Sequence, residues 1–83
     1  MKASMDDRTY SIIELVGVSE YTYDDAASRA IARASETLEG LGWFKVTELR
    51  GVIRDGEVAE YQVSLELGFR LLRDDELKKE RPS

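Results

Sequence analysis

The 83-residue sequence contains no cysteine, no histidine and only one proline. The absence of cysteine excludes disulfides, thiolate zinc sites and cysteine nucleophiles. The absence of histidine removes the commonest general base and the commonest transition-metal ligand, so we predict no metal site. A chain of this length buries only about 60% of its unfolded surface. Because small cores usually need disulfides, a metal or oligomerisation, we expect one domain that assembles with copies of itself.

Basic residues are also scarce, with 12 Lys and Arg against 17 Asp and Glu, for a net charge of −5. This charge repels polyanions, so we expect no nucleic-acid partner. The longest nearly apolar run, IIELVGV, is too short to span a bilayer. The N-terminal stretch MKASMDDRTYS has no apolar signal-peptide core. The sequence therefore predicts a soluble, cytoplasmic protein without a membrane partner.

The residue pattern predicts the element order strand, helix, strand, strand. Residues 9–18, TYSIIELVGV, are rich in β-branched and aromatic residues. Thr22 followed by Asp25 resembles a capping box, and Asp24 with Asp25 suits the first helical turn better than a catalytic pair. We expect the helix to end at Gly40 or Gly42. Its apolar stripe is predicted to comprise Ala27, Ile31, Ala34, Leu38 and Leu41, flanked by Ala26 and Ala30.

Asp55-Gly56 between two β-rich runs is a strong hairpin signal, because both central residues of a type I′ turn need positive φ. A two-residue turn pairs Arg54 with Glu57 and sets the register of both strands. The predicted pairs along the hairpin are Trp43 with Gly68, Phe44 with Leu67, Lys45 with Glu66, Val46 with Leu65, Thr47 with Ser64, and Leu49 with Gln62. This register matches apolar residues on the face that the helix covers.

The expected fold class is therefore α+β: a β-α-β-β chain with a three-stranded antiparallel sheet and one helix packed on one face. Trp43, Leu49 and Ile53 fall on the uncovered face. Two interpretations of Trp43 are open. It anchors a subunit interface, which composition alone favours, or it is a stacking platform for a planar ligand, with Gln62 supplying an amide donor and acceptor.

The segments IELVGVS, ARASETLEGLGWFKVTELRG and VAEYQVSLELGFRL resemble the dodecin family of small flavin-binding proteins. The resemblance lies in the order and spacing of a tryptophan after the helix, an Arg-Gly pair seven residues later, an Asp-Gly turn, EYQV and GFR. It runs from about Tyr10 to Leu71. We accordingly divide the chain into an N-terminal extension (1–8), a dodecin-like domain (9–72) and a charged, flexible tail (73–83).

The resemblance implies a hollow homododecamer of cubic symmetry that binds flavins in pairs between subunits. The residue at the position of Trp43 stacks on the flavin ring, and the residue at Gln62 hydrogen-bonds the ring's polar edge. The family implies storage and photoprotection of riboflavin, FMN or FAD rather than catalysis. Two departures from the common pattern, Val18 for threonine or serine and Gly42 for an acid, bear on which flavin fits.

Three further residues are candidates, Glu48 through the resemblance and two arginines through their phosphate-binding chemistry. Glu48 is an acid near the ligand's ribityl chain or a bound cation, or equally a strand-edge charge in an ion pair. Arg50 and Arg70 suit a flavin phosphate by their fork geometry, although we favour ion pairs between subunits. Since the residues form no catalytic constellation, we predict that the protein is not an enzyme. The alternative function is a structural or cation-binding oligomeric cage without flavin, in which Trp43 only seals the interface.

Overall fold

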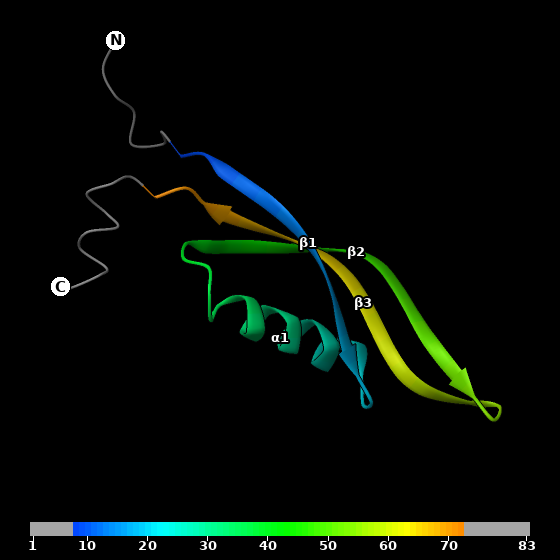
Figure 1. Cartoon of the computed structure of the whole chain (residues 1–83). Helices are drawn as coiled ribbons and strands as arrows, with labels where there is room; N and C mark the ends of the chain where they lie inside the picture. Colours follow the sequence, from blue (N-terminus) through cyan, green and yellow to red (C-terminus); the bar gives the residue numbers. More distant parts are fainter. Residues whose placement is uncertain (1–7, 73–83) are drawn as a thin grey trace, which may run out of the picture.

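The computed structural model describes residues 8–72, which comprise β1 (Tyr10–Ser19), α1 (Tyr23–Ala34), β2 (Leu41–Arg54) and β3 (Glu57–Arg70) (Figure 1). The predicted flexible tail at 73–83 and all of the predicted N-terminal extension except Arg8 lie outside the described residues. The strand order is β1-β3-β2, and both pairs are antiparallel. The predicted α+β fold, with three antiparallel strands and one helix on one face, is confirmed.

Helix α1 starts where Thr22 caps it, since the Thr22 side chain accepts a hydrogen bond from the N–H of Asp25 at 2.9 Å. The carboxylate of Asp25 does not complete a capping box but accepts from Ser19 Oγ at 2.7 Å and from Arg29 Nε at 2.6 Å. The buried Ser19 Oγ also accepts from the N–H groups of Tyr21 and Thr22. This hydrogen-bonded junction ties the end of β1 to the first turn of α1.

The helix ends at Ala34, so the predicted end at Gly40 or Gly42 is wrong. Residues 35–37 form a turn, and Gly40, with φ of 81°, supplies the left-handed conformation that brings the chain into β2. The Gly40 carbonyl then accepts a hydrogen bond from the N–H of Arg70 at 2.8 Å. Gly40 therefore joins the sheet and does not cap the helix.

Small residues bring α1 close to the sheet. Ala26, Ala30 and Ala34 are the buried stripe, whereas the predicted Ala27, Ile31, Leu38 and Leu41 are only partly buried at its margin. A Cβ at Gly17 would overlap the carbonyl oxygen of Ala26, so glycine in β1 permits this close approach. The alanines pack on Val63, Leu65 and Leu67 of β3, which complete the core.

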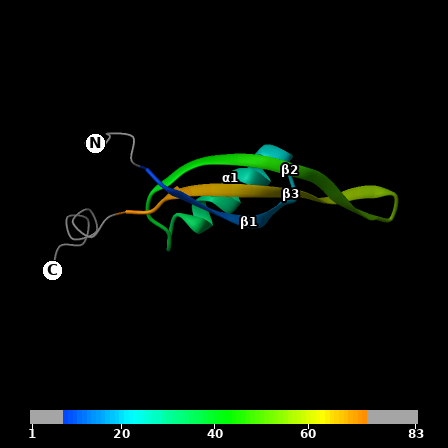
Figure 2. The ribbon, with the colours of Figure 1, turned by 90° about the horizontal axis from the view of Figure 1, so that it is seen from above.

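The helix packs on β1 and β3 and leaves much of β2 uncovered (Figures 1 and 2). Phe44, Val46 and Leu49 on the helix side of β2 remain exposed. With Ile31 of α1 and neighbouring residues they line a groove of about 630 Å³. The core of a single chain is therefore incomplete along this strand.

The hairpin turn is confirmed, since Asp55 and Gly56 have φ of 56° and 77°. Both ends of the predicted register are also confirmed, with Trp43 to Val46 pairing Gly68 to Leu65 and Arg54 pairing Glu57. Between them the register is shifted by one residue. Thr47 is an extra residue in β2, and Ala59 is an extra residue in β3.

The shift changes which side chains share a face, because a one-residue slip turns every side chain to the other side. Leu49 pairs with Val63 on the helix side, so its predicted pairing with Gln62 on the uncovered face is wrong. Arg50 pairs with Gln62, and Glu48, in place of Thr47, pairs with Ser64. The two bulges therefore place Glu48 and Arg50 on the uncovered face.

Candidate functional site

The face of the sheet opposite α1 consists of rows that cross all three strands. Because β3 is the central strand, its residues from Gln62 to Gly68 on this face each have a neighbour on β1 and another on β2. The four complete rows are Ile12–Gly68–Trp43, Glu14–Glu66–Lys45, Val16–Ser64–Glu48 and Val18–Gln62–Arg50. Apolar side chains from β1 and Trp43 therefore alternate with charged and amide groups over an uncovered surface.

Trp43 lies at one end of this face, as strand alternation predicts. Its indole is above Gly68, where a Cβ would overlap the ring atoms. Glycine on the central strand thus leaves room for the indole next to the sheet, and the side chain remains 41% exposed. The Tyr10 ring lies beside it, with centroids 6.3 Å apart and planes inclined at 44°. Tyr10 was not predicted from the sequence, because nothing local reveals which residue of β3 it pairs with.

A polar cluster of five residues, Glu48, Arg50, Glu60, Gln62 and Ser64, occupies the other end. The Nη2 group of Arg50 donates to Glu48 Oε1 at 2.6 Å and to Ser64 Oγ at 2.8 Å. The Nη1 group of Arg50 donates to Gln62 Oε1 at 3.4 Å. The Nε2 group of Gln62 donates to Glu60 Oε2 at 2.9 Å. Arg50 is therefore the centre of a network that orients the Gln62 amide.

The ion pair that the sequence suggested for Glu48 is present within the chain, with Arg50 as its partner. Its side chains are 60% and 37% exposed, so the pair alone adds little stability. Sequence reasoning missed Ser64, which joins the cluster because the bulge at Thr47 brings Glu48 opposite it. It also missed Glu60, which contacts Gln62 two residues away on the same strand. No local signal marks a bulge at that threonine.

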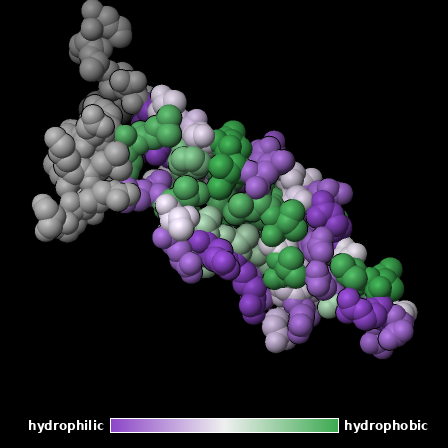
Figure 3. All heavy atoms as spheres, in the orientation of Figure 1, coloured by the Kyte–Doolittle hydropathy of each residue, from purple (hydrophilic) through white to green (hydrophobic). Residues whose placement is uncertain are grey.

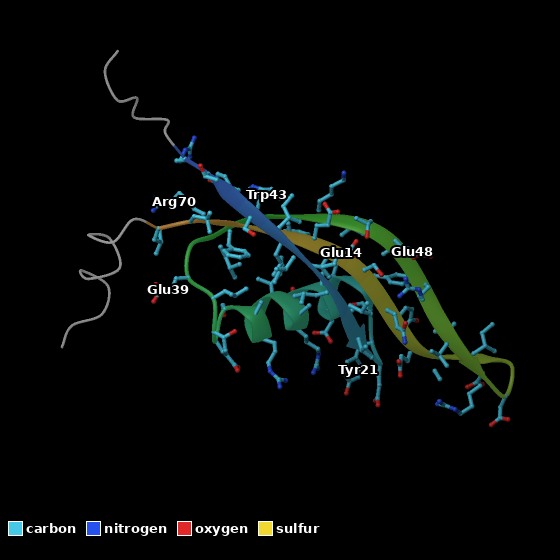
Figure 4. The ribbon with its side chains drawn as sticks, turned by 45° about the horizontal axis from the view of Figure 1, so that its top comes forward. Glu14, Tyr21, Glu39, Trp43, Glu48 and Arg70 are labelled. Atoms are coloured by element: carbon cyan, nitrogen blue, oxygen red, sulfur yellow. The ribbon has the colours of Figure 1, made fainter. Side chains whose placement is uncertain are left out.

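The five predicted site residues form two separate groups. Trp43 and Arg70 lie near one end of the sheet, whereas Glu48 lies toward the other end, beside Arg50 and Gln62 (Figure 4). Gln62 lies six positions before Gly68 on β3, a distance of about 20 Å along the extended strand. A planar ligand stacked on Trp43 therefore does not reach Gln62 of the same chain. A planar ring that contacts both residues would have to lie between two copies.

The titration of the junction at the helix start has a clear direction. The hydrogen bond from Ser19 lowers the pKa of the Asp25 carboxyl, and the hydrogen bond and charge of Arg29 lower it further.

Within residues 8–72, no group of acidic residues is arranged to hold a metal ion. No helix in the same range has the length and apolar character needed to cross a membrane.

Comparison with known proteins identifies the family. The family model named Dodecin matches residues 9–72. This chain belongs to the dodecin family. The dodecin of Thermus thermophilus is 52% identical over 64 residues, which cover 77% of this chain and 93% of that protein. The solved dodecin of Streptomyces coelicolor has a TM-score of 0.80 at 50% identity and covers 84% of this chain and 100% of its own.

Dodecins are, as a family, small oligomeric flavin-binding proteins with binding and storage roles. Solved structures of the Thermus thermophilus dodecin include three single variants. In one a tryptophan is replaced by phenylalanine, and in each of the other two a different arginine is replaced by alanine. Those three positions have the same spacing as Trp43, Arg50 and Arg70. A more distant relative, named calcium dodecin, from Mycobacterium tuberculosis, is 24% identical over 62 residues, 75% of this chain and 87% of its own.

Proposed function

We propose that this dodecin is a homododecameric flavin store that binds riboflavin, FMN or FAD between subunits and protects the flavin from light. Trp43 of one subunit stacks on the flavin ring, and Gln62 of another subunit hydrogen-bonds the ring's polar edge. The observation that carries the proposal is the position of the Trp43 indole above Gly68 on the uncovered face. It lies about 20 Å along the strand from the side-chain amide of Gln62. The cytoplasmic location remains a prediction from the sequence.

The chemistry of storage follows from these side chains. A half-exposed indole offers an aromatic face of the size needed for stacking. An indole in contact with a flavin also quenches the excited flavin by electron transfer, which returns it to the ground state before it reacts. A glutamine amide both donates and accepts, as the alternating edge of the flavin pyrimidine ring requires. We propose these roles as binding and photoprotection, not catalysis.

The two arginines lie at different ends of the uncovered face. Arg70 pairs with Tyr10 in the sheet, at the Trp43 end of the uncovered face, and Arg50 lies beside Gln62. A phosphate-bearing flavin that spans two subunits can therefore meet an arginine fork from either copy. Glu48 is proposed to act by holding Arg50, to which it is bonded at 2.6 Å.

The test is a titration of riboflavin against the purified oligomer, followed by flavin fluorescence. We expect saturable binding with strong quenching. A protein that never quenches added riboflavin contradicts the proposal. A complementation experiment then tests the shared site: Trp43→Ala and Gln62→Leu chains, each impaired alone, are co-refolded. Mixed oligomers contain some positions with an intact tryptophan from one chain and an intact glutamine from the other, so partial binding should return.

The second candidate, a structural or cation-binding cage without flavin, is supported by the name of the Mycobacterium tuberculosis relative. Calorimetric titration of Ca²⁺ into flavin-free oligomer distinguishes it. Calcium binding without any flavin binding would favour the cage. Flavin quenching that is independent of Ca²⁺ would favour storage.

A further inference from the structure

We propose that Glu48 and Ser64 are specificity-determining residues, which set how strongly the site prefers phosphorylated or unphosphorylated flavin by restraining Arg50. This inference rests on the proposed flavin-storage function. It concerns the polar cluster on the sheet face opposite α1, where Arg50 donates to both Glu48 and Ser64. Neither Glu48 nor Ser64 needs to touch the ligand for the effect.

The hydrogen-bond donors of Arg50 that a phosphate would need are already in use. A guanidinium has five N–H groups, and those of neighbouring nitrogens bind a phosphate as a fork. Both N–H groups of Arg50 Nη2 are occupied, one by Glu48 at 2.6 Å and the other by Ser64 at 2.8 Å. A phosphate that takes the fork containing Nη2 must displace one of these partners. Riboflavin has no phosphate and leaves the arrangement unchanged.

The charge of the polar cluster also acts against a phosphate. The cluster contains two acids, Glu48 and Glu60, and one base, Arg50. A flavin phosphate brings about −1.5 to −2 more charge near neutral pH. Glu48 therefore both occupies the guanidinium and repels the phosphate. Loss of the Glu48 charge should favour FMN over riboflavin.

Arg50 also links phosphate binding to recognition of the flavin ring, through Gln62. Arg50 Nη1 also donates to Gln62 Oε1, while Glu60 accepts from Gln62 Nε2. An arginine that turns toward a phosphate releases the carbonyl end of the amide. The restraint by Glu48 and Ser64 thus keeps Gln62 oriented for the flavin ring at the expense of phosphate binding.

The experiment measures the dissociation constants of riboflavin and FMN for the oligomeric wild type and for Glu48→Gln and Ser64→Ala. The readout is the ratio of the two affinities. We expect the ratio to shift toward FMN by about twofold to fivefold in Glu48→Gln, the range of a partly exposed ion pair. We expect a smaller shift in the same direction in Ser64→Ala, which removes an acceptor without changing the charge.

Two controls make the test specific. Glu66→Gln removes an equal charge from the same face at a row where Lys45, not Arg50, is the β2 neighbour, and it should shift the ratio less than Glu48→Gln does. In an Arg50→Ala background, Glu48→Gln should no longer shift the ratio beyond that control. Native mass spectrometry verifies that every variant forms the same oligomer.

The outcomes separate this inference from the proposed function. If riboflavin binds and is quenched but the ratio is the same in wild type, Glu48→Gln and Ser64→Ala, the inference is wrong and flavin storage stands. An equal shift in Glu48→Gln and Glu66→Gln also overturns it, because general charge then explains the change. A wild type that binds neither flavin overturns both.

Discussion

Gly68 and Trp43 illustrate how a single residue pair defines a surface. The indole occupies the space that any side chain at position 68 would fill, so one strand supplies the ring and its neighbour supplies the room. The sequence places both residues in strands, but their apposition depends on the register of the hairpin. The alternative role of Trp43, an anchor for a subunit interface, makes different predictions and is open to direct test.

Replacement of Trp43 with alanine should weaken flavin binding by about one to two decades. The reason is the loss of one stacked ring, worth roughly 1–3 kcal/mol by analogy with nucleobases on aromatic side chains. Fluorescence titration measures both the affinity and the residual quenching, which should fall. Trp43→Phe is the matched control, since it retains a smaller aromatic face. If affinity and quenching both survive in Trp43→Ala, the tryptophan serves only the interface.

Gln62→Leu should separate recognition from stacking. Leucine preserves the volume but leaves polar groups of the flavin edge unpaired, which costs about 1–3 kcal/mol of affinity. Quenching within the bound complex should persist, because Trp43 is unchanged. The measurements are riboflavin affinity, quenching at saturation and oligomer size, of which only the first should change. Unchanged affinity would show that the amide does not contact the ring.

At the scale of elements, the junction between β1 and α1 depends on one carboxylate. Asp25 receives hydrogen bonds from Ser19 and Arg29, and its backbone N–H donates to Thr22. Replacement with asparagine retains the backbone cap and removes the charge. Any effect of Asp25→Asn therefore reports the side-chain junction and not the loss of the N-cap.

Asp25→Asn should destabilise the fold at neutral pH, and the difference from wild type should shrink in acid. Because the hydrogen bond from Ser19 lowers the pKa of folded Asp25 below its usual value, the carboxylate stabilises the fold fully above the unfolded pKa of about 3.9. That contribution is lost as the pH falls through the folded pKa. Denaturation midpoints between pH 7 and pH 3 test this, with Asp24→Asn as control. A difference independent of pH would exclude the ionised junction.

The pair of bulges is the other decisive feature at this scale. The extra residues Thr47 and Ala59 lie in opposite strands of the hairpin and compensate each other, so the register agrees at both ends and differs between them. Without them, Leu49 would face Gln62 and the polar cluster would not form. The polar cluster thus depends on two bulges that cancel each other. A register counted from the Asp55-Gly56 turn cannot reveal them, because it is correct again beyond Thr47.

At the scale of the whole molecule, apolar side chains remain exposed on both faces of the sheet and near the hairpin tip. Those on the visible side appear as green patches in Figure 3. Beyond the last β1 pair, Ser19 with Tyr61, β2 and β3 continue as a two-stranded arm, on which Ile53 is 75% exposed. A two-stranded hairpin is only marginally stable in water. These surfaces fit a subunit whose folding is completed by neighbours.

We expect unfolding to depend on protein concentration, since association stabilises the native state by mass action. Native mass spectrometry and thermal melts over a hundredfold concentration range measure this. Ile53→Asp should weaken assembly, whereas the neighbouring exposed change Arg54→Gln should not. A stable, folded monomer with a melting temperature independent of concentration would contradict the proposal of a dodecamer.

The sequence by itself determined the features that local chemistry specifies: the four elements, the Thr22 cap, the Asp55-Gly56 turn and the face that carries Trp43. Each depends on residues close together in the chain, whose conformational preferences act before tertiary contacts form. Only the tertiary structure decided the buried alanine stripe, the strand order, the bulges and the pairing of Gln62 with Arg50. These features depend on how distant segments of the chain pack together. Strand register and the distance between helix and sheet are set by the sum of many contacts and not by any single residue.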